Sequence, residues 1–323
     1  MMKTIGLLTS GGDAPGMNAA IRAVVRTANS MDITVKAVSR GYQGMIEGDL
    51  KELTETSVSN IIQRGGTILK TARSKEFKTE EGRARAAENL RSAGVEALVV
   101  IGGDGSFRGA SLLSEEQGIR VVGIPATIDN DLIGTDMTIG YDTALNTALE
   151  AIDKIRDTAD AHDRMFLVEV MGRDAGFIAL ETGIAAGAEL ILLPEALTDI
   201  NDIRSSLNDV LQDQKRSSLI VVAEGDDNGG ALKLADKLKD DFAEYEIRVC
   251  TLGHTQRGGN PSPRDRVLAS QLGFAAVRTI VEGHDRVMVG VVNDAIKLTP
   301  LKMTWQKKKD IDFKMVELAK LLR

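Results

Sequence analysis

Acidic and glycine residues cluster at two points where an apolar run of the chain ends. The apolar run 97–101 is followed by Gly-Gly-Asp-Gly-Ser at 102–106, and the apolar run 121–124 is followed by Pro-Ala-Thr-Ile-Asp-Asn-Asp at 125–131. Burying unpaired carboxylates is costly, so these acids are not expected in a core. Parallel α/β sheets bind ligands at the carboxyl ends of their strands. The two stretches therefore predict one site, with a phosphate donor and a metal on the first and an acceptor alcohol on the second.

The first stretch has the residue types of a phosphate cradle. Its glycines allow backbone N–H groups to approach an anion closely. Asp104 only accepts hydrogen bonds when ionised and is suited to Mg²⁺. The alternative is a tight turn whose aspartate caps the next helix. The run is neither a Walker loop nor a G-x-G-x-x-G fingerprint, so neither a P-loop enzyme nor a Rossmann dehydrogenase is indicated.

The second stretch has the residue types of a proton acceptor. A sugar hydroxyl loses its proton as it attacks phosphorus, and a carboxylate within hydrogen-bond reach, such as Asp129, can take that proton. Phosphoryl transfer has a loose transition state, so the base need not be strong. The alternative is a turn rich in Asx residues. That alternative is weakened by the acidic turn at 102–106, which is predicted at the same end of the sheet.

Arginine is suited to phosphorylated substrates because its guanidinium group binds phosphate bidentately. The chain has 40 lysine and arginine residues, and most of them are expected to be surface charges. Arg173 lies in the run Met-Gly-Arg at the end of the predicted strand 165–170. Arg257 lies in a glycine-rich loop with His254, which could donate a hydrogen bond to phosphate. These positions favour a binding role. The candidates in the basic set are Arg73, Arg164, Arg173, Arg248 and Arg257.

The elements that position these residues alternate along the chain. Apolar runs such as 4–9 and 165–170 are typical of strands, and helical spacing of apolar residues predicts helices such as 17–29 and 143–160. The glycine-containing segment 40–49 is interpreted as a loop. Alternating strands and helices predict parallel sheets with helices on both faces, and the chain contains enough strands for two such sheets.

Composition limits the classes of function. The chain has 323 residues and a net charge of −7, which argues against non-specific nucleic-acid binding. Cys250 is the only cysteine, which excludes an internal disulfide and fits a reducing cytoplasm. No run approaches the roughly 20 apolar residues of a membrane span. We therefore expect a cytoplasmic protein without nucleic-acid or membrane partners.

Six segments together resemble the bacterial ATP-dependent 6-phosphofructokinase family, and the resemblance covers about residues 3–320. The segments are LLTSGGDAPGMN at 7–18, IGGDGS at 101–106, TIDND at 127–131, KIRDT at 154–158, EVMGR at 169–173 and LGHTQRGG at 252–259. Any one of them alone is a weak signal, but six in order at these separations are specific.

The resemblance implies phosphorylation of fructose 6-phosphate by ATP and Mg²⁺, giving fructose 1,6-bisphosphate in glycolysis. It implies two Rossmann-like α/β/α domains with mostly parallel sheets and the active site in the cleft between them. The larger, ATP-binding domain would comprise 1–140 plus 253–323, and the smaller, fructose 6-phosphate-binding domain 141–252. It also implies a homotetramer whose active site is shared between subunits.

The resemblance further implies a set of site residues. The catalytic residues would be Asp129 as base, Arg173 and Thr127. The metal would lie at Asp104, and the ATP pocket would be lined by Gly12, Tyr42, Arg73, Ser74, Gly103, Gly105, Ser106 and Gly109. The sugar phosphate would be bound by Thr127, Asp129, Asp131, Arg164, Met171, Gly172, Arg173, Glu224, Arg248, His254 and Arg257, with Arg164 and Arg248 reaching a neighbouring subunit.

Two residues indicate the phosphate donor. Pyrophosphate-dependent relatives typically carry Asp where this chain has Gly105, and Lys where it has Ala126. Gly105 leaves room for the α-phosphate of a nucleotide, so both residues favour ATP. Two departures from the family concern the same region. The family often has Cys-Pro where this chain has Ser74-Lys75, and it usually has Gly where this chain has Ala126. If φ is positive at position 126, the methyl group of Ala126 would be mildly strained.

A larger departure concerns the regulatory site between subunits. The family's effector site would contain Arg22, Arg26, Arg156, Glu189 and Lys215. However, Glu55 stands where some relatives have Arg, and Asp213-Gln214 where they have a basic residue and Gly. Two acids in place of two cations should repel phosphate by about 1 kcal/mol or more each. We therefore expect effector binding to be weakened while catalysis is kept.

Two alternatives to the ATP-dependent enzyme stay open at this point. One is a pyrophosphate-dependent kinase of the same family. The other is a catalytically inactive paralogue that senses a sugar phosphate or a nucleotide. The presence of Asp104, Asp129 and Arg173 argues against an inactive paralogue.

Overall fold

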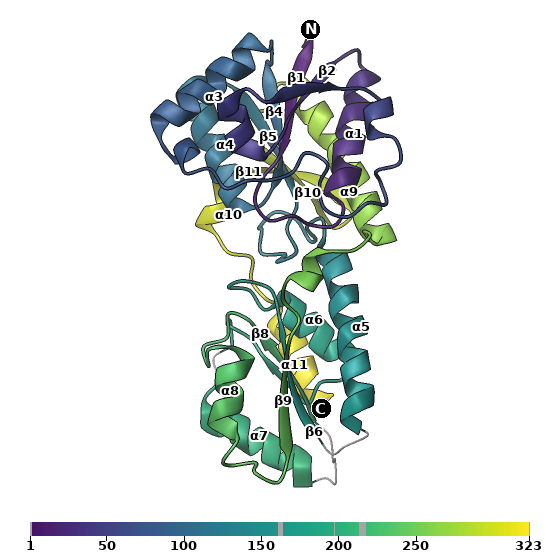
Figure 1. Ribbon diagram of the computed structural model, residues 1–323, viewed down its shortest axis with the longest axis vertical. Helices are drawn as coiled ribbons and strands as arrows, with labels where there is room; N and C mark the ends of the chain where they lie inside the picture. The colour runs from purple at the N-terminus through teal and green to yellow at the C-terminus, as the bar shows by residue number, and fades with distance from the viewer. Residues whose placement is uncertain (1, 161–163, 197, 213–217, 323) are drawn as a thin grey trace. The chain divides into compact units, whose positions relative to one another are not determined.

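The computed structural model describes residues 2–160, 164–196, 198–212 and 218–322. The chain divides into two compact units (Figure 1). Unit 1 comprises Met1–Ile128, Leu132–Thr143 and Arg257–Lys309. Unit 2 comprises Asp129–Asp131, Ala144–Gln256 and Asp310–Arg323, so the last residues of the chain belong to unit 2 rather than to the larger domain to which the sequence assigned them.

Unit 1 is built on a seven-stranded sheet. Its strand order is β11-β10-β5-β4-β1-β2-β3, where the five inner strands are parallel and the two outer strands, β3 and β11, pair antiparallel. The central strands read as continuous apolar runs because helices cover both faces of the sheet. The strands are β1 (Thr4–Thr9), β2 (Thr34–Val38), β3 (Leu50–Leu53), β4 (Ala97–Gly102), β5 (Arg120–Pro125), β10 (Val287–Val292) and β11 (Ala295–Pro300).

The helices of unit 1 cover the two faces of this sheet. Helices α1 and α9 pack side by side on one face (Figure 1). The opposite face carries a core to which α2, α3 and α4 contribute Met45, Leu90 and Phe107. The helices are α1 (Met17–Asn29), α2 (Gly41–Glu47), α3 (Glu80–Ser92), α4 (Asp104–Gln117), α9 (Pro263–Val281) and α10 (Met303–Gln306), with the 3₁₀ turns η1 (Thr56–Val58) and η2 (Glu76–Lys78).

Unit 2 has a four-stranded, fully parallel sheet in the order β7-β8-β6-β9. Its core includes Ile203 of α7 and Leu234 of α8 against the buried side chains of the sheet. The strands are β6 (Arg164–Val170), β7 (Leu190–Leu192), β8 (Ser218–Ala223) and β9 (Glu246–Thr251). The helices are α5 (Tyr141–Asp160), which begins in unit 1, α6 (Phe177–Ala185), α7 (Ile200–Gln212), α8 (Gly230–Leu238), the 3₁₀ turn η3 (Gly253–Arg257) and α11 (Phe313–Leu321).

The predicted fold class, α/β with mostly parallel sheets, is confirmed. One local prediction is wrong, because segment 40–49 contains helix α2 rather than only loop. Arg40 before the helix and Gly48 after it both adopt left-handed backbone conformations, with φ of 57° and 73°. These two residues bracket a helix too short to show apolar periodicity. None of the helices in the described part of the chain is long and apolar enough to cross a membrane.

Candidate active site

The strand order of unit 1 reverses between β1 and β4, because β2 lies beyond β1 and β5 lies beyond β4. Ligands of such sheets bind at this switch point, outside the carboxyl ends of the strands. Both glycine-rich loops start there and touch. The N–H of Ser10 donates to the carbonyl of Ile101 at 3.0 Å, and a Cβ on Gly102 would lie 2.5 Å from the Ser10 carbonyl oxygen. Unit 1 therefore holds the loops after β1 and β4 as one surface.

Helix α4 begins at this surface. Asp104 is its first residue and Gly103, which has no side chain that could cap the helix, is its N-cap. The first N–H groups of a helix and its dipole attract anions. Asp104 therefore stands within the first turn, while the capping role considered for it from the sequence falls to Gly103. The arrangement can hold a phosphate at the helix N-terminus with one carboxylate beside it.

Four of the residues predicted for the ATP pocket meet around a residue that the sequence reasoning did not identify, Phe77. The rings of Tyr42 and Phe77 are stacked, with centroids 3.9 Å apart and planes 10° from parallel. The Tyr42 hydroxyl donates to the Ser106 carbonyl, and the Ser74 hydroxyl accepts the Phe77 N–H at 3.1 Å. A Cβ on Gly109 would lie 3.1 Å from the Phe77 ring.

Burial raises the pKa of the Tyr42 hydroxyl well above its usual range, so it remains a neutral hydrogen-bond donor. The fixed Tyr42–Phe77 pair thus forms a rigid apolar support next to the start of α4. Arg73 is exposed one position before Ser74. Two features of the sequence could have identified Phe77: it lies three residues after Ser74, and it is the only aromatic residue between 43 and 106.

The turn after β5 lies against the end of β4. The Ala126 N–H donates to the Gly102 carbonyl at 2.9 Å, and a Cβ on Gly103 would lie 3.9 Å from the Thr127 Cβ. Ala126 forms a parallel bridge with Ile139 and is not among the described residues with a positive φ. The strain considered for its methyl group is therefore absent. Thr127 and the cradle at 103–106 are neighbours within unit 1.

Arg257 lies over the first glycine-rich loop. Its Nη1 donates to the Asp13 carbonyl at 3.3 Å, and a Cβ on Gly12 would come within 2.7 Å of that nitrogen. The structure thus brings Arg257, predicted for the sugar phosphate, to Gly12, predicted for ATP. Both residues belong to unit 1.

The boundary between the units falls inside the second acidic stretch, because Asp129–Asp131 packs with unit 2. The side chain of Asp129 is buried, with 7% of its surface exposed, and Asp131 is partly buried. Asn130 between them has a left-handed backbone, with φ of 52°. Asparagine tolerates this conformation better than most residues, which explains an amide between the two acids.

In unit 2, three predicted residues form one loop at the carboxyl end of β6. Gly172 has a φ of 155° and Arg173 a φ of 58°. Glu224, which follows β8, accepts the N–H of Gly172 at 3.3 Å and that of Arg173 at 2.6 Å through one carboxylate oxygen. A buried side chain that the sequence reasoning did not identify, Gln256, accepts the N–H of Met171 at 2.9 Å. Loop 171–173 is thus held from two sides.

His254 is exposed in η3, the 3₁₀ turn that follows the neighbouring strand β9. It therefore shares the carboxyl edge of the four-stranded sheet with loop 171–173 and Glu224. An exposed imidazole at this edge can donate a hydrogen bond to a bound anion.

Arg164 and Arg248 are not at that edge. Arg164 is the first residue of β6 and pairs in register with Glu246, the first residue of β9. Its Nε donates to Glu246 at 2.5 Å, and Arg248 forms a second ion pair with the same carboxylate. The hydrogen bond from Arg164 is the largest of the interactions that lower the pKa of Glu246. Both arginines thus lie toward the amino end of the sheet of unit 2.

The residues predicted for the effector site are distributed over both units. Arg22 and Arg26 lie on α1 in unit 1, and Lys215 falls outside the described residues. In unit 2, Arg156 donates to the Gly187 carbonyl at 2.6 Å and lies 3.7 Å from Glu189. The other carboxylate oxygen of the buried Glu189 accepts the N–H of Leu219 at 2.7 Å. Arg156 and Glu189 are therefore both engaged by their own unit.

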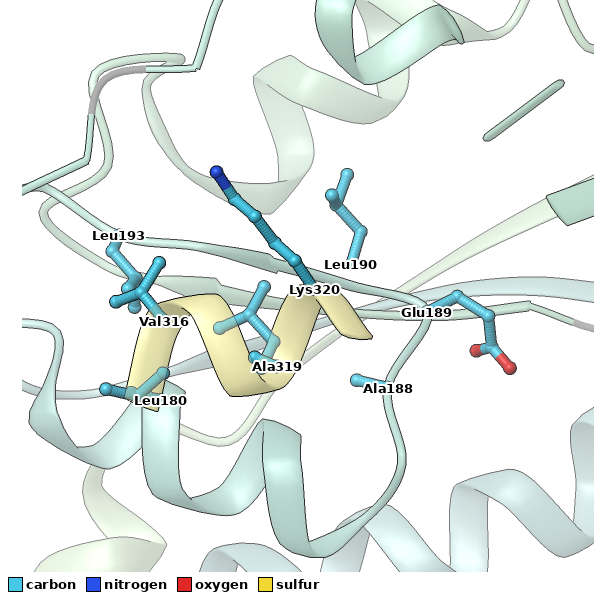
Figure 2. A pocket seen from close by; sticks show the side chains of 9 residues that line it. Leu180, Ala188, Glu189, Leu190, Leu193, Val316, Ala319 and Lys320 are labelled. Atoms are coloured by element: carbon cyan, nitrogen blue, oxygen red, sulfur yellow. The ribbon is translucent and has the colours of Figure 1, made fainter. Parts of the chain in front are cut away.

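A small, mostly apolar pocket lies beside Glu189, between α6, β7 and α11 (Figure 2). Figure 2 shows the Glu189 carboxylate and the Lys320 side chain pointing in different directions. Apart from Glu189, none of the predicted site residues lines this pocket. It does not have the residues of a phosphoryl-transfer site. The lining residues are Leu180, Ala188, Glu189, Leu190, Ile191, Leu193, Val316, Ala319 and Lys320.

The residues present fit a magnesium ion that arrives with its nucleotide. Within the described part of the chain, no group of three or more His, Cys, Asp or Glu side chains could hold a metal by itself. Mg²⁺ in kinases is commonly bound through one or two carboxylates together with substrate phosphates and water. A single carboxylate, that of Asp104, stands in the first turn of α4.

Comparison with known proteins agrees with this geometry. A model of the phosphofructokinase family matches residues 4–280. The chain is 56% identical over 321 residues to ATP-dependent 6-phosphofructokinase 1 of Thermus thermophilus, covering 99% of each chain. It is 51% identical over 321 residues to ATP-dependent 6-phosphofructokinase 2 of Bacteroides thetaiotaomicron, covering 99% of this chain and 98% of that protein.

Two solved structures have the same fold. Phosphofructokinase from Saccharomyces cerevisiae superposes with a TM-score of 0.86 at 38% identity; the match covers 98% of this chain and 46% of the yeast chain, so this chain spans about half the yeast length. Pyrophosphate-dependent phosphofructokinase from Marinobacter aquaeolei gives a TM-score of 0.84 at 25% identity, and the match covers 97% of this chain and 86% of that chain. From the family match and the full-length identities, the chain belongs to the phosphofructokinase family.

Proposed function

We propose that this protein is an ATP-dependent 6-phosphofructokinase, which phosphorylates fructose 6-phosphate to fructose 1,6-bisphosphate. The observation that carries the proposal is the close approach of the start of α4, at Gly103, to the turn that contains Thr127 and leads to Asp129. A phosphate cradle and a carboxylate-bearing turn at one switch point are what a phosphoryl transfer to an alcohol requires. Because this reaction is a step of glycolysis, we also propose a cytoplasmic location.

The choice of ATP over pyrophosphate rests on two observations. Relatives at 50% to 56% identity over nearly their whole length carry the name ATP-dependent 6-phosphofructokinase, whereas the pyrophosphate-dependent structures are 24% to 25% identical. Gly105 leaves open space, since a Cβ added there would meet no atom of the described residues within 4 Å. That space can take the α-phosphate of a nucleotide.

In the proposed reaction, unit 1 binds the nucleotide. The N-terminal N–H groups of α4 bind its phosphates, together with Gly12 and the hydroxyl of Ser106, while the Tyr42–Phe77 stack forms the apolar floor. Bound with the nucleotide at Asp104, Mg²⁺ would neutralise charge on the phosphates. Arg73, which is exposed one position before Ser74, supplies a further cation.

In the same proposal, unit 2 binds the sugar phosphate through loop 171–173, Glu224 and His254, with Arg257 of unit 1 as a further cation. Asp129 accepts the proton of the sugar 1-hydroxyl as its oxygen forms a bond to the γ-phosphorus of ATP, the bond from that phosphorus to ADP breaks, and ADP leaves. Arg173 stabilises the charge on the transferred group. Thr127 and Asp131 flank the base and orient the alcohol.

We also propose that the active enzyme is a homotetramer. Arg164 and Arg248 stand away from the loop that contains Arg173, toward the amino end of the sheet of unit 2. Residues in that position are suited to a sugar phosphate bound by a neighbouring subunit. In this arrangement each active site takes two arginines from a second copy of the chain.

The regulatory part of the proposal is that the effector site is weakened. Arg156 and Glu189 are engaged with backbone groups of unit 2 and lie close to each other. Glu55 adds an exposed acid at the start of η1. An anionic effector would therefore meet fewer available cations than the four basic residues of the predicted site, Arg22, Arg26, Arg156 and Lys215, would otherwise offer.

One coupled assay with ATP and fructose 6-phosphate, compared with pyrophosphate as donor, tests the proposal. We expect turnover with ATP and little with pyrophosphate. The Asp129→Asn variant should lose about 10²- to 10⁴-fold in kcat while it keeps substrate binding, because it removes a general base. A matched control is Asp32→Asn, at an exposed position with a φ of 58° where asparagine is tolerated.

The two alternatives give different outcomes in the same assay. A pyrophosphate-dependent enzyme would turn over pyrophosphate and not ATP. A sensor without activity would bind the sugar phosphate or nucleotide but show no turnover in the unsubstituted protein, so Asp129→Asn would have nothing to remove.

A further inference from the structure

Asp265 is a completely buried carboxylate in the first turn of α9, and it is not one of the predicted site residues. Its Oδ1 accepts the N–H of Gly140 at 2.8 Å. Its Oδ2 accepts the N–H of Thr143 at 2.8 Å and the Thr143 hydroxyl at 2.5 Å. A buried carboxylate is retained only where such donors compensate its lost hydration. The three bonds go to the start of α5, so Asp265 ties the N-terminus of one helix to that of another.

A second set of bonds closes this junction. Ser262, the N-cap of α9, accepts the Asp265 N–H at 3.2 Å and donates its hydroxyl to Asp142 at 2.5 Å. The Ser262 N–H donates to the Thr143 hydroxyl at 2.9 Å. The starts of α5 and α9 therefore form one hydrogen-bonded network, and neither can shift without breaking bonds in the other.

The segment just before α5 supports the acidic turn. The Ile139 N–H donates to the Pro125 carbonyl at 3.0 Å, and the Thr138 hydroxyl donates to the Thr127 carbonyl at 2.6 Å. Residues 138 and 139 therefore lie along the backbone of 125–127, and the next residue, Gly140, is the one that Asp265 holds. A continuous chain of bonds runs from the buried carboxylate to the turn of Thr127 and Asp129.

Gly140 also meets the first glycine-rich loop. It has a φ of 101°, and a Cβ there would lie 2.7 Å from the Cβ of Ala14. The residue is thus confined by the loop on one side and by Asp265 on the other. Its position is set by contacts that all lie within unit 1.

We propose that Asp265 is a positioning residue for the phosphoryl transfer: through Gly140, Ile139 and Thr138 it fixes the turn that presents Thr127 and Asp129. The inference rests on the proposed function, since the turn is the proposed catalytic segment. Asp265 touches no reacting group. It acts because a carboxylate alone can accept all three bonds at the start of α5, and catalytic geometry is sensitive to shifts of about 1 Å.

The first test is the Asp265→Asn variant, which keeps the volume of the side chain and replaces one acceptor oxygen by a donor. We expect kcat per folded molecule to fall about 10- to 100-fold with little change in the KM for ATP. The folded fraction is measured by circular dichroism at the assay temperature. An unchanged kcat per folded molecule would overturn the inference.

The matched control is Asp285→Asn. The Asp285 carboxylate also accepts a backbone N–H, that of Val121 at 2.8 Å, and a hydroxyl, that of Ser114. These bonds lie in the same unit but at the amino end of β5, away from the turn. We expect it to lower stability without changing kcat per folded molecule. A control that loses as much kcat as Asp265→Asn would show a general loss of rigidity and overturn the inference.

A double-mutant cycle tests the route through residue 138. Thr138→Val removes the hydroxyl bond to the Thr127 carbonyl and should itself lower kcat. If Asp265 acts through this segment, the two losses are not additive in the double variant. Additive losses would overturn the proposed route. Should Asp265→Asn fail to fold, Thr143→Val, which removes one bond to the same carboxylate, replaces it in the cycle with the same two outcomes.

These experiments separate the inference from the proposed function. If the unsubstituted protein does not phosphorylate fructose 6-phosphate with ATP, the proposed function is wrong. If it does, and Asp265→Asn is as active per folded molecule, only the positioning role is wrong.

Discussion

A single carboxylate oxygen of Glu224 accepts the N–H of Arg173 at 2.6 Å, and the backbone of Arg173 has a φ of 58°. A left-handed backbone costs a non-glycine residue roughly 1 kcal/mol, which this charge-assisted bond offsets. Glu224 was predicted from the resemblance as a substrate ligand. In the structure it also holds the arginine that is proposed to act on the transferred group.

We therefore predict different results for two substitutions of Glu224. Glu224→Ala should lower kcat/KM for fructose 6-phosphate about 10- to 100-fold, because loop 171–173 loses its acceptor. Glu224→Gln keeps an acceptor oxygen in the same place and should recover part of that loss. Steady-state kinetics with each substrate varied in turn measures both effects. Equal losses in the two variants would show that the charge, and not the loop bond, is what matters.

A second prediction concerns the space at Gly105. Gly105→Asp should fold normally, because a Cβ there meets no described atom within 4 Å. The new carboxylate should lower kcat/KM for ATP by about 10-fold or more through repulsion of the nucleotide phosphates. Gly105→Ala is the matched control, since it adds the Cβ without the charge. If the alanine variant loses as much, the effect is steric and the argument for the donor fails.

A third prediction concerns stability and pH. Burial raises the pKa of Asp265 above its ordinary value of 3.8, with Thr143 and Gly140 partly opposing the shift. The native state therefore binds a proton more tightly than the unfolded state, and ionising Asp265 lowers the free energy of unfolding as pH rises above about 3.8. Denaturant titrations should show that the unsubstituted protein is more stable than Asp265→Asn at low pH, and that this difference in the free energy of unfolding shrinks as pH rises through this window.

The Asp32→Asn variant is the control for that titration, because it makes the same substitution at an exposed turn. A stability advantage that grows with pH would mean that the hydrogen bonds outweigh burial at Asp265.

A fourth prediction concerns the effector site. Isothermal titration with ADP or phosphoenolpyruvate, with the active site blocked, should show no tight stoichiometric binding. The physical reason is that Arg156 already donates to the Gly187 carbonyl and lies 3.7 Å from Glu189. Glu55→Arg, which restores the cation found in some relatives, should strengthen binding. Tight binding by the unsubstituted protein would contradict the prediction.

Sequence patterns predicted the elements that depend on local signals. The apolar runs that became β4 and β5 ended close to where expected, so the segments 102–106 and 125–131 were correctly placed after adjacent parallel strands. Helix α2 was missed because it has only seven residues and contains glycines, which are typical of loops. Its limits are set by residues with left-handed backbones at either end. The antiparallel edge strands β3 and β11 were not anticipated, because they are mostly exposed and lack the continuous apolar runs of the buried inner strands.

The supporting residues could not be predicted from the sequence because their partners are distant along the chain. Phe77 packs against Tyr42, and Gln256 bonds the N–H of Met171. Asp265 meets Gly140 and Thr143 from more than a hundred positions away. A motif shows which residues stand next to a ligand, whereas these side chains are identified only when the fold brings the segments together.

The ion pairs at the start of β6 and β9 have an electrostatic consequence. One carboxylate, Glu246, serves two guanidinium groups, those of Arg164 and Arg248, so this three-residue cluster carries one net positive charge. Because its neighbours lower the pKa of Glu246, the same net charge persists into more acidic solution than an isolated glutamate would allow. The cluster thus keeps a net positive charge that can attract an anion, while Glu246 pairs with both arginines.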